Sequence, residues 1–191
     1  MPVLTLPPEE AAALRAAYQA AQVILEYGSG GSTVVAGDLP GRRVYAVESS
    51  APWLARMEAW FVAHPPKALV TLHHGNIGRT KAWGFPVDNR AVAQWPSYPL
   101  SVWDRADFQH PDMVLIDGRF RLACALTVLF RIVCPVHVLI DDYVDRPNYR
   151  KIEALVGVPE MVGRLARFKF TPMAMPPAAM QWIMSAYANP N

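Results

Sequence analysis

Short apolar segments of strand type alternate with helix-type segments along most of this 191-residue chain. The segments of strand type are residues 23–25, 43–47, 68–72, 113–116 and 136–140. Those with helical periodicity are residues 9–21, 32–36, 51–63 and 122–132. This alternation predicts an α/β fold with a doubly wound, mostly parallel sheet. Helices would cover both faces, and ligands would bind at the carboxyl ends of the strands.

The last part of the chain predicts an antiparallel addition to this sheet. Residues 164–171 and 180–187 look like two strands joined by a proline-rich turn, so we expect a C-terminal antiparallel hairpin. The length fits one domain over residues 1–191, and we find no internal repeat.

Residues 78–111 interrupt the alternation as an insert that is too long and too rich in proline for an ordinary connection. Its large aromatic residues are Trp83, Phe85, Trp95, Tyr98 and Trp103. Because these side chains are costly to leave in water, we expect the insert to cover the carboxyl edge of the sheet or to form a homodimer contact. The alternative is a crossover helix with irregular flanks.

The composition narrows the classes of partner. A formal charge of +2, with 52% hydrophobic and 18% charged residues, describes a packed protein without a basic face for nucleic acid or a membrane surface. Cys124 and Cys134 lie in apolar segments and indicate core residues in a reducing compartment. The amino terminus lacks a basic start followed by an apolar core, which predicts a cytoplasmic protein.

The segment VILEYGSGGST, residues 23–33, predicts a cofactor site. Gly28 and Gly30 flank Ser29 in a turn where backbone N–H groups can approach a ligand closely. The turn suits either a pyrophosphate or the amino-acid end of a sulfonium cofactor. A dinucleotide fingerprint requires glycine where Thr33 stands, and Glu26 would repel a pyrophosphate but attract an ammonium group. These two residues favour the sulfonium cofactor.

Several polar residues fall at or just beyond the ends of predicted strands, where they would line one crevice. They are Glu26, Gly28, Ser29, Gly30, Glu48, Asn76, Asp117, Asp141 and Asp142. Glu48 ends the second strand, a position suited to accept hydrogen bonds from both hydroxyls of a ribose. That feature alone does not separate a nicotinamide protein from one that uses S-adenosylmethionine.

The motifs ILEYGSGGS, YAVESS, HHGNIG, DMVLIDG and VLIDDY, in this order and spacing, resemble those of the class I S-adenosylmethionine-dependent methyltransferases. The resemblance covers most of the chain and implies their Rossmann-like fold. It implies a cofactor loop formed by Glu26, Gly28, Ser29 and Gly30, a ribose ligand in Glu48, adenine contacts from Asn76 and Ile77, and Asp117 near the reacting centre. The chain departs from the family pattern in two places. Ser32 stands where a third glycine is common, and Asn76 replaces a commoner aspartate.

The activity implied by this resemblance is methyl transfer from S-adenosylmethionine to a small-molecule acceptor, with oxygen favoured. Asp117, Asp141 and Asp142 are candidate Mg²⁺ ligands, as in related O-methyltransferases, or else they cap loops and bind backbone. Arg119 and Arg121 are candidates to hold an anionic substrate or are ordinary solvated side chains. Two alternatives stay open: a non-catalytic binding module of the same fold, and a nicotinamide oxidoreductase, which Thr33 and Glu26 disfavour.

Overall fold

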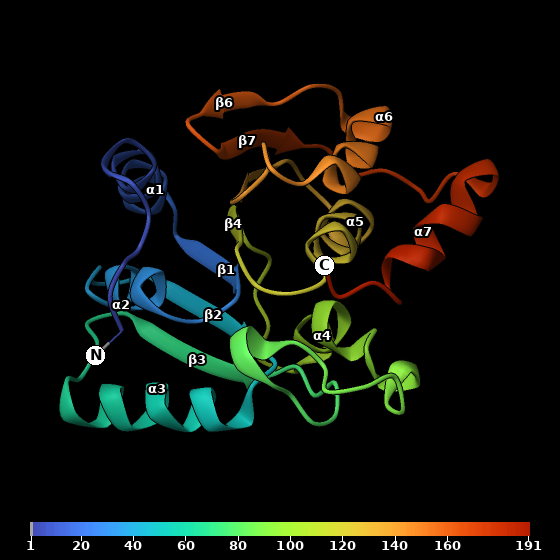
Figure 1. Cartoon of the computed structure of the whole chain (residues 1–191). Helices are drawn as coiled ribbons and strands as arrows, with labels where there is room; N and C mark the ends of the chain where they lie inside the picture. Colours follow the sequence, from blue (N-terminus) through green and yellow to red (C-terminus); the bar gives the residue numbers. More distant parts are fainter. Residues whose placement is uncertain (1) are drawn as a thin grey trace.

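A seven-stranded sheet forms the centre of the computed structural model, which describes residues 2–191 (Figure 1). The strands are β1 Val23–Tyr27, β2 Arg43–Glu48, β3 Leu69–His74, β4 Met113–Ile116, β5 Val136–Ile140, β6 Glu160–Val162 and β7 Leu165–Phe170. Their order across the sheet is β3-β2-β1-β4-β5-β7-β6. The first five strands are parallel, whereas β7 runs antiparallel to both β5 and β6. The predicted doubly wound, mostly parallel sheet is confirmed.

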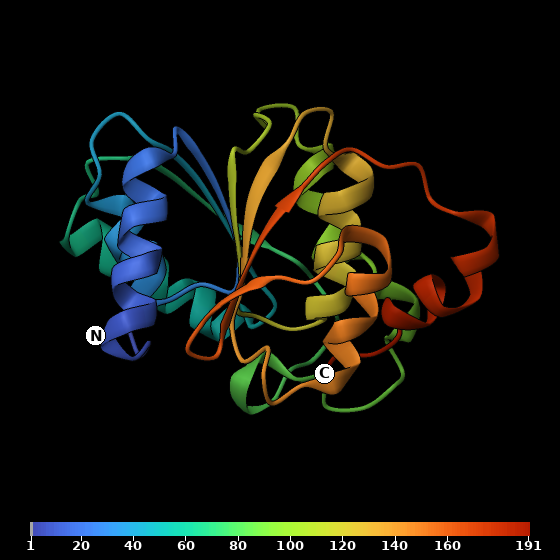
Figure 2. The same cartoon turned by 90° about the horizontal axis from the view of Figure 1, so that it is seen from above.

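Helices cover both faces of the sheet (Figure 2). They are α1 Pro8–Ala20, α2 Gly31–Gly37, α3 Ala51–Ala63, α4 Ser97–Leu100, α5 Arg121–Arg131, α6 Glu153–Val156 and α7 Met180–Ala186. Figure 2 shows α1 to α3 on one side and α4 to α7 on the other. Short 3₁₀ turns are η1 Ala82–Gly84, η2 Val92–Gln94, η3 Ser101–Asp104, η4 Pro147–Ile152 and η5 Pro177–Ala179.

The alternation of side chains along β1 explains why the core has two layers. Ile24 packs toward Leu14 and Tyr18 of α1, whereas Leu25 and Tyr27 belong to the larger cluster around α5. Successive side chains of a strand point to opposite faces, so a strand buried on both faces reads as a continuous apolar run. This is why the parallel strands were recognisable from sequence.

The C-terminal hairpin exists, but the sequence prediction assigned one of its strands wrongly. Residues 180–187 form the helix α7, and the hairpin pairs β7 with the short strand β6. Ile183 and Ala186 of α7 are buried, and Thr127 of α5 shares a 2.8 Å hydrogen bond with Tyr187. The apolar residues are therefore spaced for one helix face rather than for the alternation of a strand.

The insert 78–111 follows both of the interpretations offered for it. Its second half lies against α5 and β2, with Trp95, Tyr98 and Trp103 buried, and so takes the place of a crossover helix. Its first half curls back through a bridge between Thr80 and Pro86 and reaches the carboxyl ends of the strands. Trp83, at the tip of this loop, is 87% exposed, so the fold of one chain does not cover it, and the expected homodimer contact stays a prediction.

The two cysteines are free, and they differ in position. Cys124 is buried as predicted, but Cys134 is exposed and lies 3.6 Å from a ring nitrogen of His110. The apolar context of Cys134 was misleading because it lies in the exposed loop between α5 and β5. No helix within residues 2–191 is long and apolar enough to cross a lipid bilayer.

Candidate cofactor and active site

A cavity of about 890 Å³ opens at the carboxyl ends of β1, β2, β4 and β5. Its walls are the glycine turn after β1, the end of β2, the loops after β4 and β5, the insert loop 81–85 and the N-terminal segment 2–6. This volume lies near the upper end of the range of roughly 300–1,000 Å³ that is usual for small-molecule sites. The predicted crevice is present, and the acid at each of these strand ends stands in or beside it.

Close contact between two loops shapes the glycine turn. Gly28 has a φ of +104°, and a Cβ there would stand 2.9 Å from the backbone nitrogen of Gly118. Gly30 has open space where a side chain would be. Its N–H donates a 2.9 Å hydrogen bond to Oγ1 of Thr33, the residue that departs from a dinucleotide fingerprint. Glycine at position 28 is therefore required by the fold, while the missing side chain at Gly30 leaves open space for a ligand beside the turn.

Glu48 ties the end of β2 to the glycine turn. Its Oε1 accepts a 2.8 Å hydrogen bond from the Ser50 N–H, and its Oε2 accepts a 3.1 Å hydrogen bond from the Ser29 hydroxyl. The Nε1–H of Trp53 on α3 adds a 2.8 Å hydrogen bond to the Ser29 carbonyl. The structure thus brings Glu48, Ser29 and Gly30 into one wall of the cavity, as the prediction placed them.

Glu26 lies behind the turn rather than on the cavity surface. Its side chain is fully buried, and Oε1 accepts a 2.5 Å hydrogen bond from the Tyr18 hydroxyl, while Oε2 has no partner within residues 2–191. Burial raises the pKa of Glu26 from 4.5 to about 7, although the neighbouring hydroxyl groups of Thr33, Tyr18 and Ser32 oppose the shift. A buried carboxylate with one free oxygen suits a cationic group at the turn, which fits the ammonium end of the expected cofactor.

The stability of the ligand-free protein should therefore depend on the Glu26 proton. A folded-state pKa raised from 4.5 to about 7 stabilises the fold fully below pH 4.5 and loses that contribution as the pH rises to about 7. The loss amounts to roughly 3 kcal/mol. Urea unfolding of Glu26→Gln should lack this slope, whereas Glu9→Gln, a change on the exposed side of α1, should keep it. Parallel pH profiles for wild type and Glu26→Gln would contradict the assignment.

Asn76 and Ile77 lie apart from the other predicted cofactor residues. Asn76 is exposed, and its Oδ1 accepts a 3.0 Å hydrogen bond from the Gly78 N–H, whereas Ile77 is buried in the core. Neither lines the cavity, where the insert loop stands instead with Gly84 and Phe85. The Gly84 carbonyl accepts a 3.0 Å hydrogen bond from the Ser49 hydroxyl. Sequence spacing alone does not reveal that this loop folds back over the end of β2.

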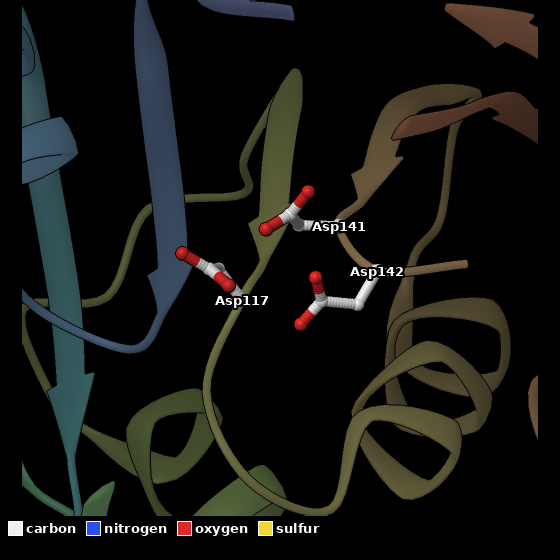
Figure 3. Close-up of side chains that lie close together, drawn as sticks. All are labelled: Asp117, Asp141 and Asp142. Carbon is white, nitrogen blue, oxygen red and sulfur yellow. The ribbon is translucent and has the colours of Figure 1, made fainter. Parts of the chain in front are cut away.

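Asp117, Asp141 and Asp142 lie close together beyond β4 and β5, with carboxylate oxygens within 4.8 Å of one another (Figure 3). Two arginines already neutralise them. Arg121 lies 3.1 Å from Asp117 and 3.0 Å from Asp142, and Arg164 lies 3.1 Å from Asp141 and 3.4 Å from Asp142. A resident Mg²⁺ would have to displace both guanidinium groups, so this donor set does not fit the metal that was a candidate from sequence.

Removal of divalent ions should accordingly leave the protein unchanged. Because Arg121 and Arg164 already supply the positive charge, neither EDTA nor millimolar Mg²⁺ should shift the melting temperature or the affinity for S-adenosylhomocysteine. Differential scanning fluorimetry and calorimetry with and without chelator provide the measurement. A stabilisation that saturates with Mg²⁺ and disappears in Asp142→Asn would contradict this interpretation.

All three aspartates line the cavity, and Asp117 has the most exposed side chain of the three. Burial, then repulsion from Asp141 and Asp142, raises the pKa of Asp117, whereas Arg121 opposes the shift. The Asp117 side chain is 39% exposed, and this contact with water reduces the rise in its pKa. A carboxyl group with a raised pKa at the edge of an open cavity is suited to exchange a proton with a bound ligand.

Several contributors to this site lie far away in sequence and carry no local signal of their role. They are the N-terminal segment 2–6, Tyr18, Trp53 and Arg164. Backbone atoms of Val3 and Leu4 cross so closely over Gly31 that a Cβ there would overlap them. Only the aromatic nature of the insert indicated that Phe85 would lie near the strand ends.

No protein-family model matches the sequence. No curated protein matches it either. Among solved structures, a methyltransferase-like protein from Silicibacter pomeroyi superposes with a TM-score of 0.95 and 47% identity, over 99% of this chain and 98% of that chain.

Two more distant structures share the fold alone. One is the O-methyltransferase TomG from Streptomyces achromogenes, solved with S-adenosylmethionine, at 18% identity and a TM-score of 0.54 over 89% of this chain and 82% of that one. The other is an O-methyltransferase from Bacillus cereus, solved with S-adenosylhomocysteine, at 16% identity and a TM-score of 0.52 over 78% and 62%.

The sheet order, the glycine turn and the acid at the end of β2 define a protein of the methyltransferase fold class. With a full-length relative at 47% identity, the chain belongs to the class I S-adenosylmethionine-dependent methyltransferase family.

Proposed function

We propose that this protein binds S-adenosylmethionine in the cavity and transfers its methyl group to a small-molecule acceptor, with oxygen as the favoured acceptor atom. The observation that carries this proposal is the convergence of Ser29, Gly30 and Glu48 on one wall of the cavity, which Asp117 also lines. The buried, half-satisfied carboxylate of Glu26 beneath the turn adds a counter-charge for a cationic ligand.

Each of these residues has a defined task in the proposal. Glu48 accepts hydrogen bonds from the ribose hydroxyls, and the open backbone at Gly30 admits the amino-acid end of the cofactor. The bound cofactor supplies an electrophilic methyl group on a positively charged sulfur. Asp117 would take the proton from the acceptor oxygen, and the methyl group would pass to that oxygen as its bond to sulfur breaks and the sulfur becomes neutral. The raised pKa of Asp117 favours the proton transfer. Positioning of the two reactants contributes most of the remaining rate enhancement.

A non-catalytic binding module is the second candidate, and one observation favours it. Asp117 and Asp142 both lie in ion pairs with Arg121, so the groups that would handle a proton are held by the protein itself. In that case the cavity would bind the cofactor without turnover.

Calorimetry followed by a transfer assay separates the candidates. Under our proposal, the purified chain binds S-adenosylmethionine and S-adenosylhomocysteine and transfers label from methyl-labelled cofactor to a member of a panel of small hydroxylated acceptors. Binding without transfer to any acceptor would favour the module. Failure to bind either compound would reject both.

A further inference from the structure

Two partly buried arginines of the cavity wall have no carboxylate partner in the described part of the chain. Arg119, in the loop after β4, and Arg146, in the loop after β5, both line the cavity, and neither forms an ion pair within residues 2–191. Both are only partly exposed, so bulk water does not fully solvate their charges. Both belong to the loops that follow β4 and β5, which also carry Asp117 and Asp142.

Local contacts hold Arg119 in place without neutralising it. Its guanidinium carbon lies 4.1 Å from the centre of the Phe85 ring, and its Nε is buried with no hydrogen-bond partner in the described chain. Desolvation, then repulsion from Arg121, lowers the pKa of Arg119, and Arg146 acts in the same direction. The aromatic contact orients the guanidinium, but a ring does not supply the planar pair of acceptors that a guanidinium can bind.

The acids of the site are already committed to other groups. Asp117, Asp141 and Asp142 form ion pairs with Arg121 and Arg164. Glu48 accepts hydrogen bonds from Ser29 and Ser50. Four arginines thus stand with three aspartates at this part of the cavity, which leaves a net positive charge, and partly desolvated cations such as Arg119 and Arg146 are stabilised by an anionic ligand.

We propose that the methyl acceptor carries an oxyanionic group, with a carboxylate as the leading case, and that Arg119 and Arg146 hold this group beside Asp117. This inference rests on the proposed function, because it assigns the ligand of the acceptor half of the same cavity. A phosphate monoester has the same chemistry and is distinguished by the test. Arg119 and Arg146 thereby act as specificity residues that orient the acceptor while Asp117 takes its proton.

The test uses the full chain saturated with S-adenosylhomocysteine. Only the part of the cavity at Arg119, Arg146 and Asp117, where the acceptor would bind, is then accessible to a second ligand. Calorimetry then measures the binding of three anions, 4-hydroxybenzoate, phenyl phosphate and inorganic phosphate, and of the neutral isostere 4-hydroxybenzamide. Inorganic phosphate is included because its binding does not depend on the shape of an organic scaffold. We expect at least one organic anion to bind tighter than the amide by roughly tenfold or more, the effect of one charge-assisted hydrogen bond.

Variants assign the effect to the two arginines. Arg119→Gln and Arg146→Gln should each weaken anion binding by roughly 10- to 100-fold and remove the preference over the amide. Arg119→Lys should restore part of the affinity, because it keeps the charge but loses the paired geometry. Arg150→Gln, a change at an exposed arginine outside the cavity lining, is the matched control and should have no effect.

Three results would overturn the inference, and each differs from a failure of the proposed function. The inference fails if none of the three anions binds at millimolar concentration, or if their binding is equal in wild type and both glutamine variants. It also fails if the variants weaken S-adenosylhomocysteine as much as the anions, since the arginines would then serve the cofactor carboxylate. Loss of S-adenosylhomocysteine binding by the wild type would instead reject the proposed function.

Discussion

Replacing Glu48 with alanine should lower the affinity for S-adenosylhomocysteine by roughly 100-fold or more. Under the proposed function, its carboxylate accepts two hydrogen bonds from ribose hydroxyls, and bonds to a charged acceptor contribute roughly 1.5–3 kcal/mol each. The same carboxylate holds the Ser29 hydroxyl and the Ser50 N–H in the free protein. Its removal therefore also loosens the wall against which the cofactor would lie.

Calorimetry on purified variants measures this loss directly. Glu48→Gln should be intermediate, because an amide keeps one acceptor oxygen but has no charge. Glu58→Ala, on the exposed side of α3, removes the same charge away from the cavity and serves as the matched control. An unchanged affinity in Glu48→Ala would show that the ribose is not bound at the end of β2.

Replacing Gly118 with alanine should destabilise the fold by roughly 1–3 kcal/mol, the usual cost of overpacking a tight interior contact. The added Cβ would overlap the Tyr98 hydroxyl and stand 2.9 Å from the backbone nitrogen of Gly28. The Tyr98 ring is buried between Tyr27 and Phe120, with ring centroids at 6.0 and 5.8 Å, so it has little room to move. The backbone of the loops after β1 and β4, which both line the cavity, must therefore shift to accommodate the added Cβ.

Urea unfolding monitored by circular dichroism gives the change in the free energy of unfolding. Gly30→Ala is the matched control, because no atom lies within 4 Å of a Cβ at that position. Without ligand, the Gly30→Ala variant should unfold at a urea concentration close to the midpoint of the wild type. Equal stability of Gly118→Ala and wild type would mean that the loops after β1 and β4 separate easily, contrary to the close approach seen here.

The parallel part of the fold was predictable because its signals are local. Strands buried on both faces, such as β1 and β2, read as continuous apolar runs, and the motifs at their ends indicated the glycine turn and Glu48. The segment 180–187 was less informative, because a short apolar run fits a helix as well as a strand. Packing of Ile183 against the core around α5 decided in favour of the helix.

The candidate site was predictable only in part, because several of its side chains form ion pairs or hydrogen bonds with residues that are distant in sequence. Arg164 faces Asp141 across 23 residues, and the acidic cluster that resembled a metal site is neutralised in this way. Asn76 matched a family motif, yet the insert loop occupies the cavity wall beside Ser49 instead. No spacing rule gives the position of a long loop that folds back on the sheet.

From the order of its residues alone, the chain determined its strands and most helices, the parallel sheet and the edge at which polar strand ends gather. These features follow from side-chain periodicity and backbone freedom, which operate over a few neighbouring residues. The tertiary structure decided which charges are neutralised and which remain: Arg121 and Arg164 are matched by aspartates, while Arg119 is not. Ion pairing depends on distances of a few ångströms between segments that only the folded chain brings together.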